Sequence, residues 1–280
     1  MENTIQITIA VNDENVRDEL IARLSIVQYD AFEEKENELA AFIKEESFDA
    51  QVLENILNDY EVNYTKSFIK DQNWNALWET NFQPVIVDDF CAIRAEFHKP
   101  FLNKKHEIII TPKMSFGTGH HATTYMMISE MRNVNLKEKQ VADFGTGTGV
   151  LAILAEKLGS KYVWATDNDD WSIDNAKENI VKNGCANIII EKADGFNPKL
   201  KFDVILANIN RNIILENVEN IYSGLNDNGK LLISGLLRGD EAEVAFSFEE
   251  KGFQHILTVE RNRWICVLFV KGQSADYIDL

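Results

Sequence analysis

The first 70 residues carry two recurring patterns of hydrophobic positions. Apolar and polar side chains alternate over residues 4–10, which predicts a strand, whereas Val16, Leu20 and Leu24 recur at helical spacing. Both patterns return, so six elements are predicted in the order strand, helix, strand, strand, helix, strand. They are expected at residues 4–10, 14–24, 25–34, 37–45, 49–60 and 61–70. This order is typical of a ferredoxin-like split βαβ unit, a small α+β domain.

A short aromatic segment follows this unit. Trp74, Leu77 and Trp78 lie at helical spacing, and Pro84 ends the pattern. We therefore predict a connecting helix within a linker of residues 71–100. Its aromatic face is expected to pack against a core or between domains.

Strand-like and helix-like segments alternate through the remainder of the chain, residues 101–280. Strands are expected at residues 106–111, 140–144, 162–167, 187–191, 202–207 and 230–234, with a final pair within 256–270. Helices are expected at residues 121–131, 148–158, 171–183, 211–222 and 241–252. Such alternation predicts an α/β domain whose mostly parallel sheet is covered by helices on both faces.

The charge of the chain limits the class of partner. The 280 residues have a formal net charge of −17, and residues 1–70 hold 16 Asp and Glu side chains against 6 Lys and Arg. An acidic protein repels a phosphate backbone, which argues against nucleic acid as the main partner. The charge is compatible with a basic protein, with a cationic small molecule, or with a simple need for solubility.

Cysteine usage and hydropathy indicate the compartment. Cys91, Cys185 and Cys266 are odd in number and widely spaced, so neither a disulfide framework nor a metal site is expected. The first residues lack the basic and apolar regions of an export signal. No apolar run approaches the ~20 residues of a membrane span. We therefore expect a cytoplasmic protein with no membrane contact.

The segment QVADFGTGTGVLAILAEKLG predicts a strand, a glycine-rich turn and a helix. Gly145, Gly147 and Gly149 follow Asp143, but Val150 stands where a dinucleotide-binding fingerprint has its third glycine. The Gly-Lys-Ser/Thr ending of a phosphate-binding loop is also missing. The turn therefore predicts close approach of a ligand without a phosphate group, or a purely structural tight turn.

A strand that ends in Asp167 narrows the choice of ligand. Asp167 follows Gly145 by 22 residues, where an acidic side chain can accept hydrogen bonds from both hydroxyls of an adenosine ribose. A ligand with a ribose and no phosphate indicates S-adenosyl-L-methionine. Asp169 and Asp170 are acidic alternatives, expected instead in solvent or at the N-cap of the next helix. Asp194, beyond the following strand, is predicted to reach the adenine amino group or to be a turn residue.

A neutral amide ends the strand FDVILAN. The carboxyl ends of strands in an open α/β sheet line the ligand crevice, so Asn208 is expected beside the target amine and the methionine end of the cofactor. Only a neutral amine is nucleophilic, and a free lysine has a pKa of about 10.4. A carboxylate would stabilise the ammonium form, whereas an amide would not. Asn208 is therefore the predicted catalytic residue, with a strand-terminal turn as the alternative.

These motifs together resemble one family, the bacterial methyltransferases that modify the eleventh large-subunit ribosomal protein. DQNWNALWETNFQPV is similar to the family's D-x-x-W-x-x-x-W-x-x-x-F-x-P linker, and FGTGHHATT is similar to its F-G-T-G-x-H-x-T-T motif. DFGTGTGVLAI, TDND and LANI follow in the family's order, so the resemblance covers most of the chain. The family's cofactor-binding residues match Thr124, Gly145, Asp167 and Asn208.

The resemblance implies a fold, a reaction and a partner. Residues 1–70 would form a ferredoxin-like substrate-recognition domain, and residues 101–280 a class I, Rossmann-like methyltransferase domain that binds S-adenosyl-L-methionine. The implied reaction is repeated N-methylation, up to trimethylation, of lysine side chains and of the N-terminal amine of the large-subunit ribosomal protein eleven. We expect a monomer without direct sequence-specific nucleic acid binding.

The acidic N-terminal region has a possible use in this scheme. Complementary charge raises association rates, so we hypothesise that four glutamates attract the basic substrate. These are Glu33, Glu34, Glu36 and Glu38. Two other interpretations stay open: a class I methyltransferase acting on another protein, a base or a small amine, and a non-catalytic RNA-binding cofactor sensor. The acidic charge argues against bases and against RNA.

The string Phe-Gly-Thr-Gly occurs twice, and its two copies predict different devices. Residues 144–147 belong to the glycine turn, whereas residues 116–119 predict a flexible loop that brings Thr124 to the cofactor from the opposite side. His120 and His121 directly follow residues 116–119. They either order the loop or supply a general base, since histidine titrates near neutrality.

Overall fold

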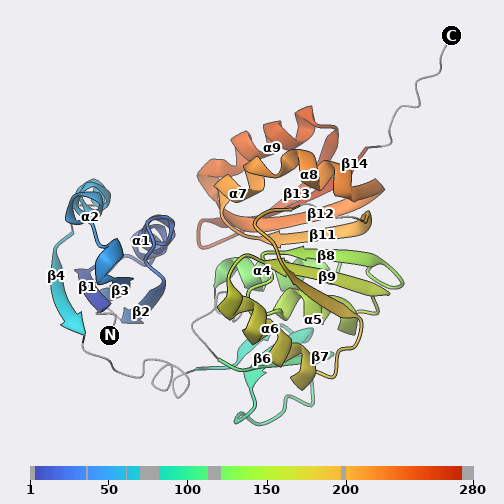
Figure 1. Ribbon diagram of the computed structural model, residues 1–280, viewed down its shortest axis with the longest axis horizontal. Helices are drawn as coiled ribbons and strands as arrows, with labels where there is room; N and C mark the ends of the chain where they lie inside the picture. Colours follow the sequence, from blue (N-terminus) through green and yellow to red (C-terminus); the bar gives the residue numbers. More distant parts are fainter. Residues whose placement is uncertain are drawn as a thin grey trace. The chain divides into compact units, whose positions relative to one another are not determined.

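The computed structural model describes residues 4–35, 37–60, 62–69, 82–112, 121–196 and 200–272. Contacts between Cα atoms divide the chain into two compact units, Met1–Thr80 and Asn81–Leu280. Each unit has its own hydrophobic core. Figure 1 draws the described part of the first unit in blue and that of the second from teal to red.

The first unit has the predicted order of strands and helices. Its strands lie antiparallel in the order β2-β3-β1-β4, the arrangement of a ferredoxin-like split βαβ unit. The elements are β1 (Thr4–Ala10), α1 (Glu14–Ile26), β2 (Ala31–Lys35), β3 (Glu38–Lys44), η1 (Glu45–Ser47), α2 (Ala50–Leu57), η2 (Asn58–Tyr60) and β4 (Tyr64–Ile69). Asp13 and Asp49 cap the two helices by accepting hydrogen bonds from backbone N–H groups.

One strand of this region begins later than predicted, and one predicted helix lies outside the described residues. The strand predicted at residues 25–34 starts only at Ala31, because α1 continues to Ile26 and the chain then turns at Gln28, which has a φ of 70°. The connecting helix predicted in the linker falls largely on residues 70–81, which lie outside the described residues.

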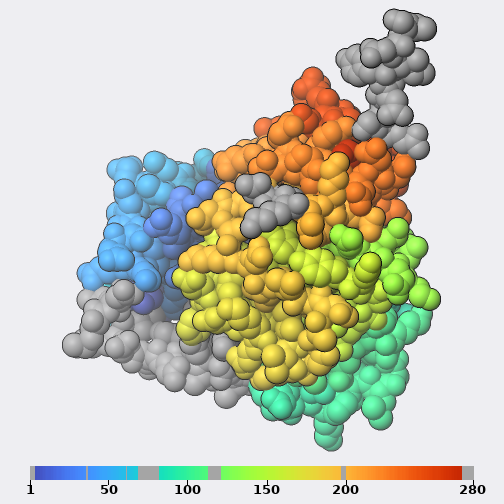
Figure 2. All heavy atoms as spheres, turned by 45° about the vertical axis from the view of Figure 1, so that its right-hand side comes forward, coloured from blue at the N-terminus to red at the C-terminus, as the bar shows by residue number. Residues whose placement is uncertain are grey.

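The second unit opens with a small three-stranded sheet in the order β5-β6-β7. Its strands are β5 (Val85–Val87), β6 (Cys91–Ala95) and β7 (His106–Ile110). Figure 1 shows α5 (Val150–Lys157) and α6 (Asp170–Lys182) between this sheet and the large sheet of the unit. In Figure 2 the teal surface, which includes the small sheet, lies below a yellow surface formed by later residues of the same unit.

A seven-stranded sheet forms the centre of the second unit, in the order β10-β9-β8-β11-β12-β14-β13. The first five strands are parallel, and β14 and β13 complete the sheet as an antiparallel hairpin. The strands are β8 (Gln140–Phe144), β9 (Tyr162–Asp167), β10 (Ile188–Lys192), β11 (Phe202–Asn208), β12 (Leu225–Leu237), β13 (Phe253–Arg261) and β14 (Trp264–Lys271). The predicted Rossmann-like, mostly parallel sheet is confirmed.

Helices cover both faces of this sheet. On one face α4 (Ala122–Met131) contacts β14, where the sulfur atoms of Met127 and Cys266 are 3.6 Å apart. Side chains of three further helices pack with the opposite face, whose residues include Ile265 and Val267. These helices are α7 (Arg211–Glu216), α8 (Val218–Gly224) and α9 (Glu241–Glu250), the last preceded by η3 (Arg238–Asp240). The single helix predicted at 211–222 is thus broken, at Asn217.

None of the described helices is long and apolar enough to cross a membrane. All three cysteines are free thiols, as the sequence predicts. The described residues contain no group of three or more His, Cys, Asp or Glu side chains placed to hold a metal ion.

Candidate cofactor-binding and active site

The glycine turn follows β8 directly and begins α5. Gly145, Gly147 and Gly149 have φ values of 74°, 54° and 80°, a left-handed backbone region in which side chains with a Cβ are strained. A Cβ on Gly145 would also overlap the side chain of Ile209. The turn therefore requires glycine for its conformation and for its close approach to the end of β11.

Asp167 lies at the carboxyl end of β9, beside the glycine turn. Its Oδ2 accepts a hydrogen bond from the Gly147 N–H at 2.8 Å, and its Oδ1 accepts one from the Asp169 N–H at 3.1 Å. Asp169 itself caps α6 by accepting from the Ser172 N–H, and Asp170 pairs with Lys192. Of these three carboxylates, Asp167 is therefore the one that is bonded to the turn.

Asn208 and Thr124 meet although 84 positions separate them in the sequence. The Asn208 Nδ2 donates a hydrogen bond to the Thr124 Oγ1 at 3.1 Å, and both side chains are buried. The Asn208 Oδ1 is buried and has no hydrogen-bond partner among the described residues. This amide therefore retains one free acceptor.

A small pocket joins these residues to the glycine turn. Thr124, from α4, and Asn208, from β11, lie on its wall together with Gly145. The remaining lining residues are Thr146, Thr148, Val150 and Leu151. Sequence reasoning selected the glycines of the motif and missed the two threonines between them, although their alternation with glycine was a visible signal.

Asp143, at the end of β8, forms hydrogen bonds with the glycine turn and with α5. Its side chain is fully buried, and its Oδ2 accepts hydrogen bonds from the Thr146 hydroxyl at 2.6 Å and the Ala152 N–H at 3.1 Å. Desolvation by burial raises the pKa of this carboxyl to about 7, although the two hydrogen bonds oppose the shift. The Asp143 carboxyl is thus a buried titratable group bonded to the glycine turn.

We expect Asp143→Asn to change how stability depends on pH. The unfolded chain releases the Asp143 proton near its ordinary pKa of 3.8, whereas the folded protein holds it to about pH 7. The folded state therefore binds more protons in this window, so wild-type stability contributed by this group is lost as pH rises. From pH 4 to 7 the variant should gain on the order of a few kcal/mol relative to wild type.

Urea denaturation of both proteins at several pH values in this window measures the difference. A constant difference in the free energy of unfolding would show that Asp143 ionises in the folded protein as it does in the unfolded chain.

His121 orders the start of α4. It caps α4, its Nδ1 lies 2.8 Å from the Thr123 Oγ1, and its ring packs edge-on against Trp264 with the ring centroids 4.6 Å apart. Burial lowers the pKa of the His121 imidazole to about 4. A neutral imidazole therefore fixes the first turn of α4, which carries Thr124. His120 and the first Phe-Gly-Thr-Gly string lie outside the described residues.

Asp194 lies at the same edge of the sheet but not in the pocket. The Ala193 N–H donates to the Asp167 carbonyl oxygen at 2.9 Å, which places the turn after β10 beside the end of β9. The Asp194 side chain is exposed and does not line the pocket. Its contact with adenine stays a prediction.

This site lies in a chain that matches one protein family almost end to end. Residues 2–272 match the family model of ribosomal protein L11 methyltransferase (PrmA). The chain belongs to the PrmA family. The resemblance drawn from the sequence motifs is thereby confirmed, and the protein is an S-adenosyl-L-methionine-dependent protein methyltransferase.

Individual relatives agree with this assignment. The chain is 37% identical to the ribosomal protein L11 methyltransferase of Phocaeicola vulgatus over 266 residues, which are 92% of this chain and 95% of that protein. It is 35% identical to the protein of the same description from Chlorobaculum parvum over 270 residues, 91% of this chain and 93% of that protein. The crystal structure of ribosomal protein L11 methylase from Lactobacillus delbrueckii subsp. bulgaricus is similar with a TM-score of 0.64 and 32% identity, covering 69% of this chain and all of that one.

The pocket and the glycine turn beside it carry groups that suit S-adenosyl-L-methionine. Asp167, which is bonded to the turn but does not line the pocket, presents a half-buried carboxylate at the end of β9, suited to ribose hydroxyls. The glycine turn lets a ligand approach the backbone, and Val150 and Leu151 supply apolar wall. The unpartnered Asn208 Oδ1 needs a hydrogen-bond donor from outside the described residues, which an amine or ammonium group provides.

Proposed function

We propose that this protein transfers methyl groups from S-adenosyl-L-methionine to ribosomal protein L11, on lysine side chains and on the N-terminal amine, up to three on each nitrogen. Membership of the PrmA family supports the substrate protein. The observation that carries the choice of an amine is the buried Asn208 amide, which keeps a free acceptor beside the glycine turn. The compartment we propose is the cytoplasm.

The residues predicted from the sequence would each bind a different part of the cofactor. Asp167 would accept hydrogen bonds from the ribose hydroxyls, and Gly145 and Gly147 would allow the backbone to approach the ligand. Thr124 and Asn208 would bind near the methionine end, and we keep Asp194 as the proposed contact to adenine. When bound, S-adenosyl-L-methionine supplies an electrophilic methyl group on a sulfonium.

The reaction needs a neutral amine held in line with that methyl group. The nitrogen lone pair would form the new N–C bond as the S–C bond breaks, which would leave S-adenosylhomocysteine. After the first two transfers the product ammonium would pass a proton to water, whereas the third would give a permanently charged quaternary ammonium. In the first two transfers the Asn208 Oδ1 would accept one N–H of the neutral amine and fix its orientation without adding the negative charge that stabilises ammonium. The tertiary amine of the third transfer carries no N–H, so this bond would be absent there. Positioning of this kind supplies much of the barrier reduction in a two-reactant step.

Substitutions of Asn208 test this role. Asn208→Ala is expected to lower kcat about 100-fold, because the amine loses its oriented acceptor, while Kd for S-adenosylhomocysteine changes much less. Asn208→Asp should move the rise of the pH–rate profile to higher pH, since a carboxylate favours the ammonium form. Steady-state kinetics from pH 6 to 10 measure both effects. A kcat within about twofold of wild type for Asn208→Ala would remove Asn208 from the mechanism.

We also propose that the first unit recognises the substrate protein through its acidic surface. Glu33 and Glu34 lie on β2, 3.6 Å from Lys35 and 3.7 Å from Arg17 respectively, and both carboxylates are about half exposed. Glu38 begins β3 and is exposed, whereas Glu36 lies outside the described residues. The negative charges of Glu33, Glu34 and Glu38 would act at long range on a basic protein.

Reversal of three of these charges tests that proposal. The variant Glu33→Lys, Glu34→Lys, Glu38→Lys is expected to lower kcat/KM about tenfold at low salt and to flatten its dependence on salt concentration. Methylation of a short lysine peptide at the same salt is the control, since the effect requires the folded basic partner. Unchanged kcat/KM and salt dependence would contradict this role.

Mass spectrometry of ribosomal protein L11 tests the proposed function as a whole. L11 from a strain that lacks the enzyme is measured before and after incubation with the protein and S-adenosyl-L-methionine. Increments of one to three methyl groups on lysines and on the N-terminus are expected. An L11 that stays unmodified would overturn the proposal. Methylation of another protein or of RNA in place of L11, in an extract of the same strain, would do the same.

A further inference from the structure

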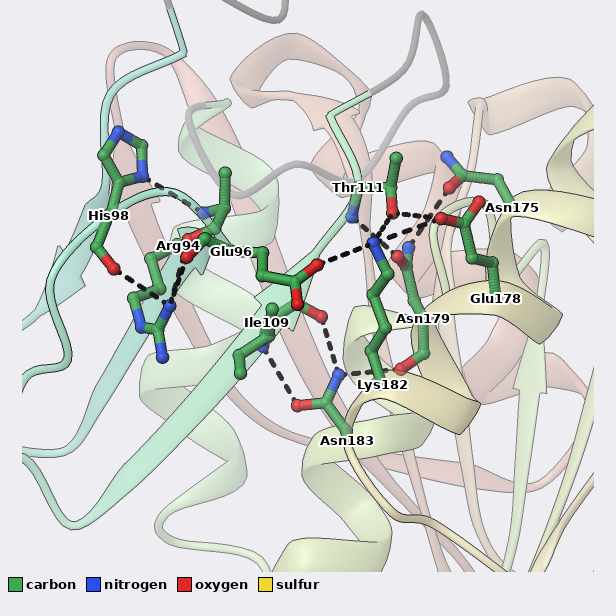
Figure 3. A network of polar contacts seen from close by, with 11 residues as sticks. Arg94, Glu96, His98, Ile109, Thr111, Asn175, Glu178, Asn179, Lys182 and Asn183 are labelled. Atoms are coloured by element: carbon green, nitrogen blue, oxygen red, sulfur yellow. Dashed lines mark hydrogen bonds and ion pairs between the residues drawn. The ribbon is translucent and has the colours of Figure 1, made fainter.

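Three asparagines form a ladder along one face of α6. Asn175, Asn179 and Asn183 are spaced four residues apart, so their side chains lie one above another and face β7 and the glycine turn (Figure 3). Asn175 and Asn179 are fully buried. Buried amides need hydrogen-bond partners, and those of Asn179 and Asn183 include two separate parts of the chain, the end of β7 and the glycine turn. The Asn175 Oδ1 accepts from Asn179, whereas its buried Nδ2 has no partner among the described residues.

Two of the amides bind the edge of β7. The Asn183 Oδ1 accepts from the Ile109 N–H at 3.0 Å, and its Nδ2 donates to the Ile109 carbonyl oxygen at 2.6 Å. The Asn179 Oδ1 accepts from the Thr111 N–H at 2.8 Å. The helix thus pairs with the backbone of this strand edge as another strand would.

Only Asn179 of the two also reaches the glycine turn. Its Nδ2 donates to the Thr148 carbonyl oxygen at 2.8 Å and to the Asn175 Oδ1 at 3.3 Å. Thr148 lies between Gly147 and Gly149 and lines the pocket. One buried amide therefore bonds at the same time to the end of β7 and to the turn that we assign to the cofactor.

Several other contacts also hold the end of β7, whereas the hydrogen bond from Asn179 to the Thr148 carbonyl oxygen acts on the glycine turn. The Thr111 Oγ1 donates to Glu178 at 2.6 Å and accepts from the Lys182 Nζ at 2.6 Å, and Lys182 also pairs with Glu96 across 3.4 Å (Figure 3). With Asn183, these contacts hold the strand when Asn179 is changed. Loss of the Asn179 amide would instead leave the Thr148 carbonyl without this buried donor.

We propose that Asn179 is a positioning residue, which holds the glycine turn in the conformation that binds the cofactor and fixes it relative to the end of β7. This inference rests on the proposed function only in taking the turn as the cofactor site. Asn179 touches neither cofactor nor substrate in the scheme above; it acts through the Thr148 backbone.

Asn179→Ala and the matched control Asn183→Ala test the proposal, because both remove an amide of α6 from the same strand edge. Asn179→Ala is expected to raise Kd for S-adenosylhomocysteine about tenfold, and Asn183→Ala to change it less than about twofold. Calorimetric titration measures Kd, and thermal unfolding measures Tm, which should fall in both variants. Equal changes of Kd at equal loss of Tm would show a merely structural role and overturn the proposal.

Hydrogen exchange on the wild-type protein needs no variant, and so covers a failure of Asn179→Ala to fold. Addition of S-adenosylhomocysteine should protect the Thr111 N–H, which is bonded to Asn179, more than the Ile109 N–H, which is bonded to Asn183. Equal protection of the two amides would overturn the coupling. Wild type that binds S-adenosylhomocysteine but leaves L11 unmodified would contradict the proposed function and leave Asn179 tested on its own terms.

Discussion

Asp167→Ala is expected to weaken binding of S-adenosyl-L-methionine by about 2–3 kcal/mol, or about 30- to 150-fold in Kd, with the fold intact. Two losses add. The ribose hydroxyls lose a charged acceptor, and the Gly147 N–H loses the carboxylate oxygen that it meets at 2.8 Å. The side chain is only half-buried, so its removal leaves little cavity. Calorimetric titration with the cofactor gives Kd, and circular dichroism reports the fold.

Asp169→Ala is the matched control for this prediction. Asp169 is two residues further along, carries the same charge, and caps α6 through the Ser172 N–H. Its loss should cost about 1 kcal/mol of stability and leave Kd within about threefold. Equal effects of the two variants on Kd would mean that general negative charge, and not the Asp167 carboxylate, attracts the cofactor.

The sequence was sufficient to predict those strands and turns that a single local pattern of residues specifies. Buried strands that end in Asp167 and Asn208 predicted a parallel sheet with polar side chains at its carboxyl edge, and the sheet has both residues at the ends of their strands. The rule that parallel strands end at the same edge needs no knowledge of packing. The glycine pattern likewise specified the turn, because Gly145 has a conformation that other residues avoid.

Contacts between distant segments could not be predicted in this way. The bond between Asn208 and Thr124, and the bonds of Asn179, join residues that are far apart in the sequence but adjacent after folding. Periodicity also gave no reason for the helix break at Asn217, whose side chain accepts from the Phe196 N–H and so serves a tertiary contact. The pKa of Asp143 depends on complete burial, which the sequence suggests only through neighbouring apolar residues.

Gly235→Ala is expected to be the most damaging small substitution in the second unit. Gly235 has a φ of 88° and lies at a bulge in β12, between Ser234 and Leu236. A Cβ there would overlap the Ile209 carbonyl oxygen and lie 2.7 Å from its carbonyl carbon. Backbone atoms yield little, and the Ile209 N–H is bonded to the Ser234 carbonyl oxygen at 3.2 Å, so the two segments cannot simply separate.

Relief of this overlap must displace the chain directly after Asn208, which carries the proposed amine contact. We expect Gly235→Ala to cost about 3 kcal/mol of stability and to lower methyl transfer at least about 100-fold in the protein that stays folded. Gly239→Ala is the control, because no atom lies within 4 Å of its added Cβ, and its stability should stay within about 0.5 kcal/mol of wild type. Thermal unfolding and single-turnover methylation measure the two effects. Wild-type rates in Gly235→Ala would show that the position of Ile209 does not control the geometry at Asn208.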